Sequence, residues 1–499
     1  MSLLPPRSLL LVLCFAFLRP LRILCVLCVS AGEGPSLFGS RFAGFGGFGS
    51  GCCKLPNPVV GLFAMNRKGY TATLAVLVAV NVLNFYDRHV IGALTEPIRK
   101  EFGLTDSEVG LMSSAFIWLY ALVGLPLGRV ADRWSRKKLL ASGMLVWSAL
   151  TAMAAAATSY TMLLCSRLGF AVGEAVVAPA ATSWIGDIFP AVERSRPLAL
   201  FMLGVPVGGA LSYFFSGPVA QSFGWRTAMI LAAVPAVILI PILLRLTEPA
   251  RGAAESHREA PPRSAWSAIL KIPTMWWIIA SGALLNFNMY AIGIFLPAFL
   301  SRVHHLTLSR SGIATGIVFA IGGTTGGLLA GRLGDRVIHT RKNGRLLVAA
   351  VISAIGVPVF YFGIGAGEAM AAIALITFGY GSLNAYYGLV YSSIQDIVAP
   401  AMRGTAMAIY FMAMYMCGAS FGPLLTGRLS DMMAHRAAEA AGSTVITEAF
   451  KATGLQQAMF IIPVLSLLLA VVLYAGSRTI IADMRKREAP AAAAIAHAD

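Results

Sequence analysis

The chain contains little charge for its length. Only 12% of its 499 residues are Asp, Glu, Lys or Arg, whereas 57% are hydrophobic, and a soluble domain usually carries roughly a quarter charged residues. The mean hydropathy of +0.75 points the same way. This shortage of charge excludes an ordinary soluble globular fold and indicates an integral membrane protein.

Cysteine is scarce beyond the N-terminal stretch. Most Cys residues fall within the first 53 residues, and Cys165 and Cys417 stand alone in apolar stretches. Cys25 and Cys28 lack partner ligands at a metal-site spacing. The sequence also lacks a G-x-x-x-x-G-K-[ST] loop and a nucleophile constellation. We therefore expect no disulfide framework, no metal or other cofactor, no ATP-driven pump and no enzyme.

Apolar stretches of about 20 residues recur along the chain, and each is long enough to cross a bilayer as a helix. Helices satisfy their own backbone hydrogen bonds in lipid. We therefore expect an all-α membrane protein with twelve transmembrane helices, at residues 69–95, 107–130, 138–157, 162–186, 197–217, 226–246, 273–300, 310–333, 345–364, 368–395, 404–426 and 456–477.

The net charge of +17 could suggest a nucleic-acid partner, but its distribution argues against one. Lys and Arg concentrate on alternate loops, as at Arg133, Arg136, Lys137, Arg251 and Lys342. This bias predicts that these loops and both termini are cytoplasmic. Orientation and contact with anionic lipid account for the excess charge. We expect a multi-pass protein of the inner or plasma membrane that binds no nucleic acid and is a monomer.

The first 64 residues differ from the rest, with a Leu- and Cys-rich run followed by "RFAGFGGFGSGCC". They are either a signal or anchor segment or an upstream extension before a working start at Met65, which we favour, and we expect them to be disordered. A charged, Pro-rich stretch later in the chain predicts a cytoplasmic linker. The expected organisation is an extension at 1–64, an N-terminal half at 65–246, the linker at 247–272, a C-terminal half at 273–477 and a tail at 478–499.

The two halves repeat each other. The stretch "GLPLGRVADRW" (124–134) aligns with "GLLAGRLGDRV" (327–337), "LNF" at 83–85 recurs at 285–287, and a Gly-Pro pair recurs in spans five and eleven. Three matches at nearly one offset indicate an internal duplication. Two parallel six-helix halves joined by a linker are one architecture of secondary transporters.

A Gly-x-x-x-Asp-Arg motif ends span two and recurs at the end of span eight. Such a charged latch suits a cytoplasmic gate that holds in one state and breaks in another, although the motif could serve topology alone. The predicted gate residues are Gly128, Asp132, Arg133, Arg136, Asp335 and Arg336.

Glycines spaced four apart form stripes on two helices, Gly323–Gly327–Gly331 and Gly204–Gly208. Such stripes permit close helix contact. They predict either an interface that moves or static packing.

With these motifs the chain resembles the major facilitator superfamily over about residues 67–480. Within it the chain resembles the spinster-like branch through "NVLNFYDRHVIGALTEPIRKEFGLTDSEVGLMSSAFI" and "SRLGFAVGEAVVAPAATSWIGDIFP". Ser135 and Ala171 depart from the family pattern at two expected glycines. The matching residues in spans one and four are Asn84, Asp87, Arg88, Arg167, Gly173, Glu174 and Ala175.

Four charged residues lie well inside these spans: Asp87, Arg88, Arg167 and Glu174. A charge at the bilayer centre costs roughly 2.5–3.5 kcal/mol on insertion scales, so each needs a partner or a wet cavity. The repeat places Met289 and Tyr290 where the first half has Asp87 and Arg88. Because the equivalent helix forms without these charges, we interpret them as functional.

We predict that Glu174 is the main proton site and that Asp87 is coupled to it, because a buried carboxylate near an arginine can load and release a proton. We predict that Arg88 meets an anionic head group, while neutral amide and tyrosine groups face it from the second half. The tyrosines are equally consistent with packing. The predicted substrate-binding residues are Arg88, Asn84, Arg167, Asn286, Tyr290, Tyr380, Asn384 and Tyr387.

The resemblance implies a secondary transporter that works by alternating access on an amphipathic anion, such as a lysophospholipid or sphingoid phosphate. Proton coupling is our expectation from the buried carboxylates. A facilitator for small organic anions or amphiphilic drugs is the alternative. A membrane sensor without transport is disfavoured, because the linker and tail provide no large soluble module.

Overall fold

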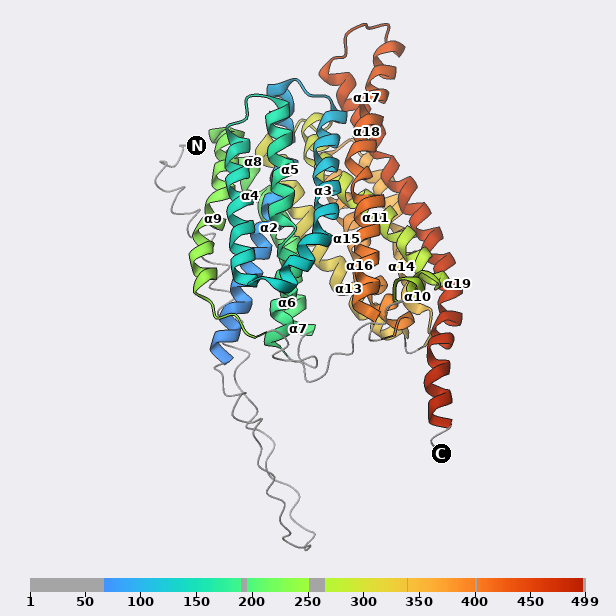
Figure 1. Cartoon of the computed structure of the whole chain (residues 1–499). Helices are drawn as coiled ribbons and strands as arrows, with labels where there is room; N and C mark the ends of the chain where they lie inside the picture. The colour runs from blue at the N-terminus through green and yellow to red at the C-terminus, as the bar shows by residue number, and fades with distance from the viewer. Residues whose placement is uncertain (1–66, 190–194, 251–264, 339, 400–401, 497–499) are drawn as a thin grey trace, which may run out of the picture. The chain divides into compact units, whose positions relative to one another are not determined.

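The computed structural model describes residues 67–189, 195–250, 265–338, 340–399 and 402–496 (Figure 1). Within these ranges every regular element is a helix. Twelve helical segments there are long and apolar enough to cross a membrane, which confirms the predicted fold class and number of spans. The predicted N-terminal extension and residues 251–264 of the linker lie outside the described residues.

The chain divides into two compact units, residues 1–77 and 78–499. The described part of the first unit is the beginning of the first helix, and all contacts discussed below lie within the second unit. The helices of the N-terminal half are α2 (Arg67–Phe102), α3 (Asp106–Arg133), α4 (Arg136–Ala155), α5 (Tyr160–Glu174), α6 (Val177–Ile188), α7 (Ser195–Met202), α8 (Gly204–Phe223) and α9 (Trp225–Arg245).

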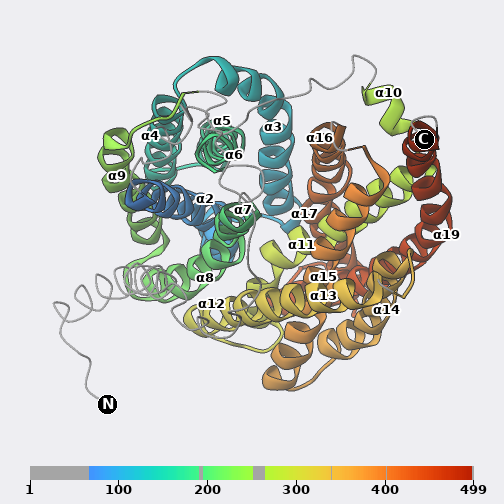
Figure 2. The same cartoon turned by 90° about the horizontal axis from the view of Figure 1, so that it is seen from below.

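The C-terminal half adds two π-helical turns, η1 and η3. Figure 2 shows its helices beside those of the first half. They are α10 (Ala265–Leu270), α11 (Pro273–Arg302), α12 (Leu308–Ile317), η1 (Val318–Gly322), α13 (Gly323–Ile338), α14 (Gly344–Ile364), α15 (Ala369–Ile397), α16 (Arg403–Met414), η3 (Tyr415–Ala419), α17 (Phe421–Ala440), α18 (Glu448–Met459) and α19 (Ile461–Ala496).

Several spans are interrupted at places that the apolar pattern alone does not reveal. Span four breaks between α5 and α6, directly after Glu174. Pro179 in the first turn of α6 has no N–H to bond the carbonyl of Ala175, which favours a break there. In span eleven Pro423 likewise leaves the carbonyl of Ala419 without its helical partner, and the π-helical turn η3 ends at that residue. Such turns occur often at functional sites.

Spans eleven and twelve are longer than predicted. Helix α17 continues to Ala440, beyond the expected end at 426, and α18 begins at Glu448, before the expected start at 456. The added residues of α17, "GRLSDMMAHRAAEA", are rich in Ala and other helix formers but not apolar. Hydropathy therefore identifies the apolar segment of each helix that is long enough to cross the bilayer. It misses the extensions, which project at the top of Figure 1.

The halves pack closely at one face, through α3 against α17 and α8 against α12. A Cβ added at Gly110 would collide with the carbonyl of Pro423, and one at Gly427 with the carbonyl of Asp106. We call the face near residues 103–105, where these contacts lie, the closed face. Its glycines are required because the two backbones touch.

The opposite ends of the same spans are apart, and we call the face near residues 134–135 the open face. A Cβ added at Gly124, Gly128, Gly327 or Gly331 would meet nothing within 4 Å. Helices α13 and α16 make their main contacts within their own half. In the span-eight stripe, Gly327 and Gly331 are therefore unpacked in this conformation, whereas a Cβ added at Gly323 would contact Pro206 at 3.7 Å.

The other glycine stripe has a different role. A Cβ added at Gly204 would lie 2.7 Å from the amide nitrogen of Asn81, and one at Gly208 would collide with the carbonyl of Val82. Both contacts lie within the N-terminal half. Gly204 and Gly208 therefore serve static packing of α8 on α2.

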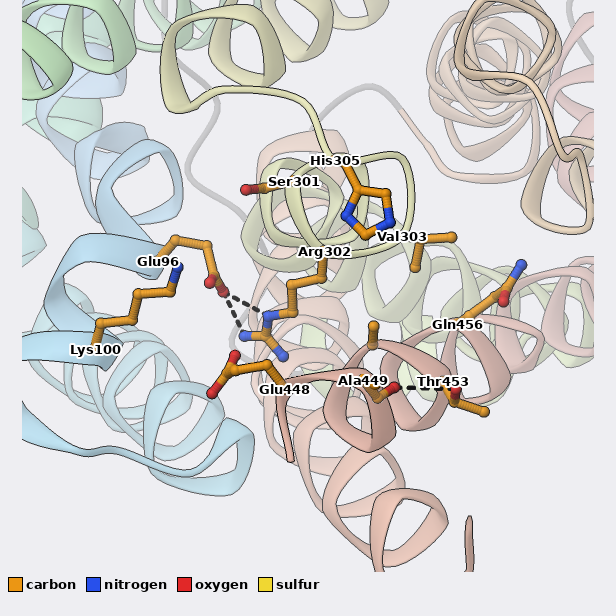
Figure 3. Close-up of a pocket in the computed structure, with 11 residues that line it drawn as sticks. Glu96, Lys100, Ser301, Arg302, Val303, His305, Glu448, Ala449, Thr453 and Gln456 are labelled. Carbon is orange, nitrogen blue, oxygen red and sulfur yellow. Dashed lines mark hydrogen bonds and ion pairs between the residues drawn. The ribbon is translucent and has the colours of Figure 1, made fainter. Parts of the chain in front are cut away.

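A network of ion pairs, buried except for the exposed carboxylate of Glu448, joins the halves at the closed face (Figure 3). Arg302 on α11 donates to Glu96 on α2 at 2.6 Å and to both oxygens of Asp106 at 2.8 Å. Arg99 on α2 donates to Glu448 on α18 at 2.6 Å. A cavity of about 480 Å³ beside this network is lined by Glu96, Arg302 and Glu448 among others. These ion pairs hold the closed face together.

We expect Arg302→Gln to shift the protein toward a form in which the closed face opens. The change leaves Glu96 and Asp106 buried without their main cation, and removing one partner of a buried pair costs about 3–5 kcal/mol. Since 1.4 kcal/mol is a tenfold change in an equilibrium, the ratio of forms should change by more than tenfold. Spin labels at Leu111→Cys and Met432→Cys, which are exposed on α3 and α17, would report the longer distance.

Arg310→Gln is the matched control. Arg310 is an exposed arginine at the start of α12, and only its backbone N–H, not its side chain, hydrogen-bonds a described residue. Its distance distribution should equal that of the unmodified chain. Equal distributions for both arginine variants would show that the Arg302 network does not hold this face closed.

Candidate functional site

Arg88 and Glu174 form a buried ion pair at the centre of the N-terminal half. Arg88 on α2 donates to Oε2 of Glu174 through Nε at 3.1 Å and through Nη2 at 2.9 Å. Glu174 is fully buried and Arg88 is 6% exposed. The break of span four after Glu174 sets this carboxylate at a helix end, where the guanidinium reaches it.

Asp87 and Arg167 lie next to this pair but outside hydrogen-bonding distance of each other. The Nη1 atom of Arg167 is buried without a partner among the described residues. Glu174 and Arg167 act on Asp87 through their charges, and the indole of Trp147 on α4 is its neighbouring hydrogen-bond donor. The guanidinium of Arg167 lies over the ring of Phe170, 4.2 Å from its centre. The structure thus gathers all four predicted intramembrane charges.

Aromatic residues surround Arg88 on its other side. The guanidinium carbon lies 4.5 Å from the ring centre of Tyr120 and 4.8 Å from that of Phe85. Across the interface, Nη1 donates to the hydroxyl of Tyr290 on α11 at 3.5 Å. The ring of Tyr415 in η3 lies 5.8 Å from that of Tyr120. Arg88 is therefore the charge that the second half contacts.

Tyr120 and Tyr415 were not among the predicted site residues. The repeat contains a signal for one of them, because Tyr415 stands at an offset of 202 from Tyr213, whose hydroxyl donates to the carbonyl of Gly293 across the other interface at 2.5 Å. Tyr120 has Gly323 at the equivalent position. No pattern in the sequence alone singles it out.

The predicted neutral residues of the C-terminal half form two groups. The Tyr387 hydroxyl donates to Asn286 at 3.2 Å, and the Asn286 amide donates to the carbonyl of Gly282 at 2.9 Å. Asn384 donates to the carbonyl of Tyr380 at 3.0 Å, and the Tyr380 ring packs on Phe319 in η1 at 4.5 Å.

These contacts bear on the two interpretations of the tyrosines. Tyr380 is 4% exposed, so its present role is packing. Tyr387 and Asn384 are partly exposed, and they remain candidates for contact with a substrate. Asn84 on α2 is buried, and its amide nitrogen has no partner among the described residues.

Arg136, a predicted gate residue, is the centre of a network at the open face. It is fully buried and pairs with Asp187 at the end of α6. Its backbone and side chain also donate to Glu248 at 2.8 Å and 2.9 Å. Ser135 donates to the same carboxylate at 2.6 Å. These contacts tie spans three and four to the start of the linker, all on the N-terminal side of the molecule.

The remaining predicted gate residues make fewer contacts. Arg133 and Arg336 are exposed, and a Cβ added at Gly128 would meet open space. The side chains of Asp132 and Asp335 lie outside the described residues. A gate across the open face therefore stays a prediction in this conformation.

Burial acts to raise the pKa of the Glu248 carboxyl, but hydrogen bonds from Ser135 and Arg136 outweigh it and hold that pKa below its ordinary value of 4.5. Glu248 is thus charged near neutral pH and stabilises the buried guanidinium. Among the described residues, no group of three or more His, Cys, Asp or Glu side chains could hold a metal ion.

The profile of the Major Facilitator Superfamily matches residues 77–423. The chain belongs to this superfamily. It is similar to an MFS-type efflux pump of Mycolicibacterium smegmatis, at 29% identity over 72% of this chain and 85% of that protein. It is also similar to human protein spinster homolog 1, at 27% identity over 72% of this chain and 73% of that protein.

Solved structures support the same placement. A bacterial homolog of the human lysosomal transporter spinster, in an inward-facing and unoccupied conformation, matches with a TM-score of 0.76 and 25% identity, over 84% of this chain and 99% of that one. A D-xylose-proton symporter at 16% identity and a TM-score of 0.62 shares the fold. This chain is a spinster-like membrane transporter of the superfamily.

We expect Glu248→Gln to lower the free energy of unfolding by roughly 1–3 kcal/mol at neutral pH, because the buried Arg136 loses a charged acceptor. A carboxylate whose folded pKa is depressed contributes stability above its unfolded pKa and loses it as the pH falls through the folded value. The difference from the unmodified protein should therefore shrink below about pH 4.5. Thermal unfolding in detergent across pH values measures it.

The control is Glu368→Gln, since Glu368 is exposed and its side chain does not cap α15. It should unfold as the unmodified chain does at every pH. A stability loss for Glu248→Gln that does not change with pH would contradict the proposed role of its charge.

Proposed function

We propose that the chain couples the movement of an amphipathic anion, such as a lysophospholipid or sphingoid phosphate, to protons by alternating access. The observation that carries this proposal is the Arg88–Glu174 pair, which is buried, central and contacted from the second half through Tyr290. One arginine thus has two possible partners, the carboxylate of Glu174 and an incoming anion.

Competition for Arg88 provides the coupling. While Glu174 is ionised, its Oε2 atom holds two donors of Arg88. A proton on Glu174 removes the negative charge and weakens this hydrogen-bonded pair. The freed guanidinium can then bind the anionic head group. Asp87, buried beside both residues, responds to the same proton through its electrostatic contact with Glu174.

The conformation is consistent with one half of such a cycle. Contacts between the halves are concentrated at the closed face, and the ends of spans two and eight are apart at the open face. The similar bacterial spinster homolog is inward-facing. We assign the open face, with its basic loops, to the cytoplasm, and we place both termini there.

The substrate class rests on the resemblance to spinster-like proteins and on the division of polarity at the site. The charges lie on α2 and α5, whereas the second half offers tyrosine, amide and apolar groups. The similar mycobacterial protein is an efflux pump, which favours a second candidate, transport of amphiphilic drugs or small organic anions. We expect a monomer without enzymatic activity.

We expect Glu174→Gln to abolish uptake driven by a pH gradient in proteoliposomes, because the amide cannot exchange a proton at this site. Radiolabelled sphingosine phosphate and a lysophospholipid are the probes, with a cationic amphiphilic dye for the second candidate. Uptake that still responds to the gradient as in the unmodified chain would refute the role of Glu174. Uptake of the dye alone would favour drug transport.

We expect Arg88→Lys to weaken binding of the anionic probes by about tenfold or more, because an ammonium cannot form the two-donor contact of a guanidinium. Binding of the cationic dye should change less. Scintillation proximity binding at two pH values measures both. Anion binding that is unaltered would remove Arg88 from the substrate site.

A further inference from the structure

The guanidinium of Arg88 has one polar side that Glu174 does not occupy. Its Nε and Nη2 atoms both donate to Oε2 of Glu174, at 3.1 and 2.9 Å, which leaves Nη1 for other partners. The rings of Phe85 and Phe116 face the guanidinium carbon, which lies 4.8 and 5.5 Å from their centres. Nη1 instead donates to the hydroxyl of Tyr290 at 3.5 Å. An anion can therefore meet Arg88 at Nη1 while Glu174 keeps the other two donors.

Three tyrosine hydroxyls gather at this end of the guanidinium. Tyr290 on α11, Tyr120 on α3 and Tyr415 in η3 each have Arg88 as a hydrogen-bonding neighbour. The Tyr415 ring contacts both others, with centres 5.8 Å from that of Tyr120 and 6.2 Å from that of Tyr290. We call these three residues the tyrosine cluster. One helix of the first half and two segments of the second contribute one hydroxyl each.

The hydroxyl protons of the tyrosine cluster lack the acceptors that other interior tyrosines have. The hydroxyl of Tyr213 donates to a backbone carbonyl, and that of Tyr387 donates to the side chain of Asn286. The hydrogen-bonding neighbours of the tyrosine cluster are Arg88 and the cluster's own members. Because a guanidinium only donates, hydroxyl protons that are not used inside the cluster are available to a bound acceptor. Tyr391 is a neighbour of other tyrosines but not of Arg88.

The tyrosine cluster lies at the inner end of the space between the halves. All three of its rings are partly exposed. Gly124 is one turn from Tyr120 along α3 toward the open face, and a Cβ added there would meet nothing within 4 Å. A molecule that enters from the open face would thus meet the three hydroxyls and the Nη1 atom of Arg88 together.

The second interface between the halves, where α8 packs on α12 and η1, has no such cluster. Gly323 stands at the position equivalent to Tyr120. Tyr213, which is equivalent to Tyr415, donates its hydroxyl to the backbone of α11 at 2.5 Å. The fold therefore closes one interface without available hydroxyl protons, so helix packing alone does not require the tyrosine cluster.

We propose that the tyrosine cluster and the Nη1 atom of Arg88 form a head-group subsite that selects tetrahedral oxyanions, such as phosphate esters, over carboxylates. Glu174 occupies the Nε–Nη2 edge of the guanidinium, one of the edges with which a carboxylate forms a bidentate pair. The hydroxyls come from three separate segments, and the ring planes cross at 67° and 80°. Donors on several sides match the non-coplanar oxygens of a phosphate ester better than the two coplanar oxygens of a carboxylate.

This inference rests on the proposed transport of an amphipathic anion and names the chemical class of its head group. Phosphate monoesters and diesters share the tetrahedral group, so a sphingoid phosphate and a lysophospholipid both fit, whereas a fatty acid does not. A site built to hydrogen-bond a ligand discriminates strongly, because a poorer ligand leaves its polar groups unpaired. Tyr120 and Tyr415 thus become residues that determine specificity.

Binding of matched amphiphiles tests the subsite. The radiolabelled probes are sphingosine phosphate, a lysophospholipid and a fatty acid, measured by scintillation proximity at one pH. We expect Tyr120→Phe and Tyr415→Phe each to weaken binding of the phosphate probes by about tenfold or more, as for the loss of one hydrogen bond to a charged group. Fatty-acid binding should change little. Phenylalanine keeps the ring, so the aromatic packing around Arg88 is retained.

Tyr361→Phe is the matched control, because Tyr361 is exposed on α14 and its ring contacts only other rings among the described residues. It should bind every probe as the unmodified chain does. A loss for one phosphate probe alone would support the subsite and identify a monoester or a diester as the head group. Equal losses for phosphate and carboxylate, unaltered phosphate binding, or a preference of the unmodified chain for the fatty acid would overturn the subsite. An unmodified chain that binds none of the three would overturn the proposed anion transport as well.

Discussion

The Arg88–Glu174 pair is the constraint on which the rest of the structure depends. Two charges at the centre of a membrane helix bundle are tolerated only when they satisfy each other, since breaking such a pair leaves an uncompensated buried charge. Its geometry requires span four to end a helix at Glu174 and span one to bring Arg88 within 2.9 Å. The packing of α2 against Gly204 and Gly208 of α8 fixes the side from which Arg88 approaches.

Much of the architecture follows from the sequence. Twelve apolar runs predict the spans, because each crossing must be long enough for the bilayer and must satisfy its own backbone hydrogen bonds. The repeat of the Gly-x-x-x-Asp-Arg motif predicts the two halves. The extensions of α17 and α18 escape this reasoning, since Ala-rich polar helix has no hydropathy signal. The π-helical turns escape it too, because they depend on how Pro423 and the glycines of span eight meet the neighbouring helices.

The candidate site was predictable in its composition and less so in its pairing. Asp87, Arg88, Arg167 and Glu174 stand out because charge inside a span is rare. The choice of Glu174 as the partner of Arg88, with Asp87 turned toward Trp147, depends on the break of span four. Tyr120 shows the limit, since one aromatic residue among many apolar ones has no signal until the fold brings it to 4.5 Å from Arg88.

The asymmetry between the halves would give the proposed alternating-access movement a low energetic cost. All four central charges lie on α2 and α5 of one half, so rocking of one half against the other leaves the buried ion pair intact. What separates at the centre is a long hydrogen bond to Tyr290, at 3.5 Å, and contacts between aromatic rings. The ion pairs that must break between the halves, those of Arg302 and Arg99, lie at the closed face near the helix ends. Water can replace those partners when that face opens, because a charge near the surface recovers its hydration. If the central ion pair joined the two halves, it would have to break whenever the halves moved apart. Each of its charges would then be left unpaired at the bilayer centre, where water could not replace the partner.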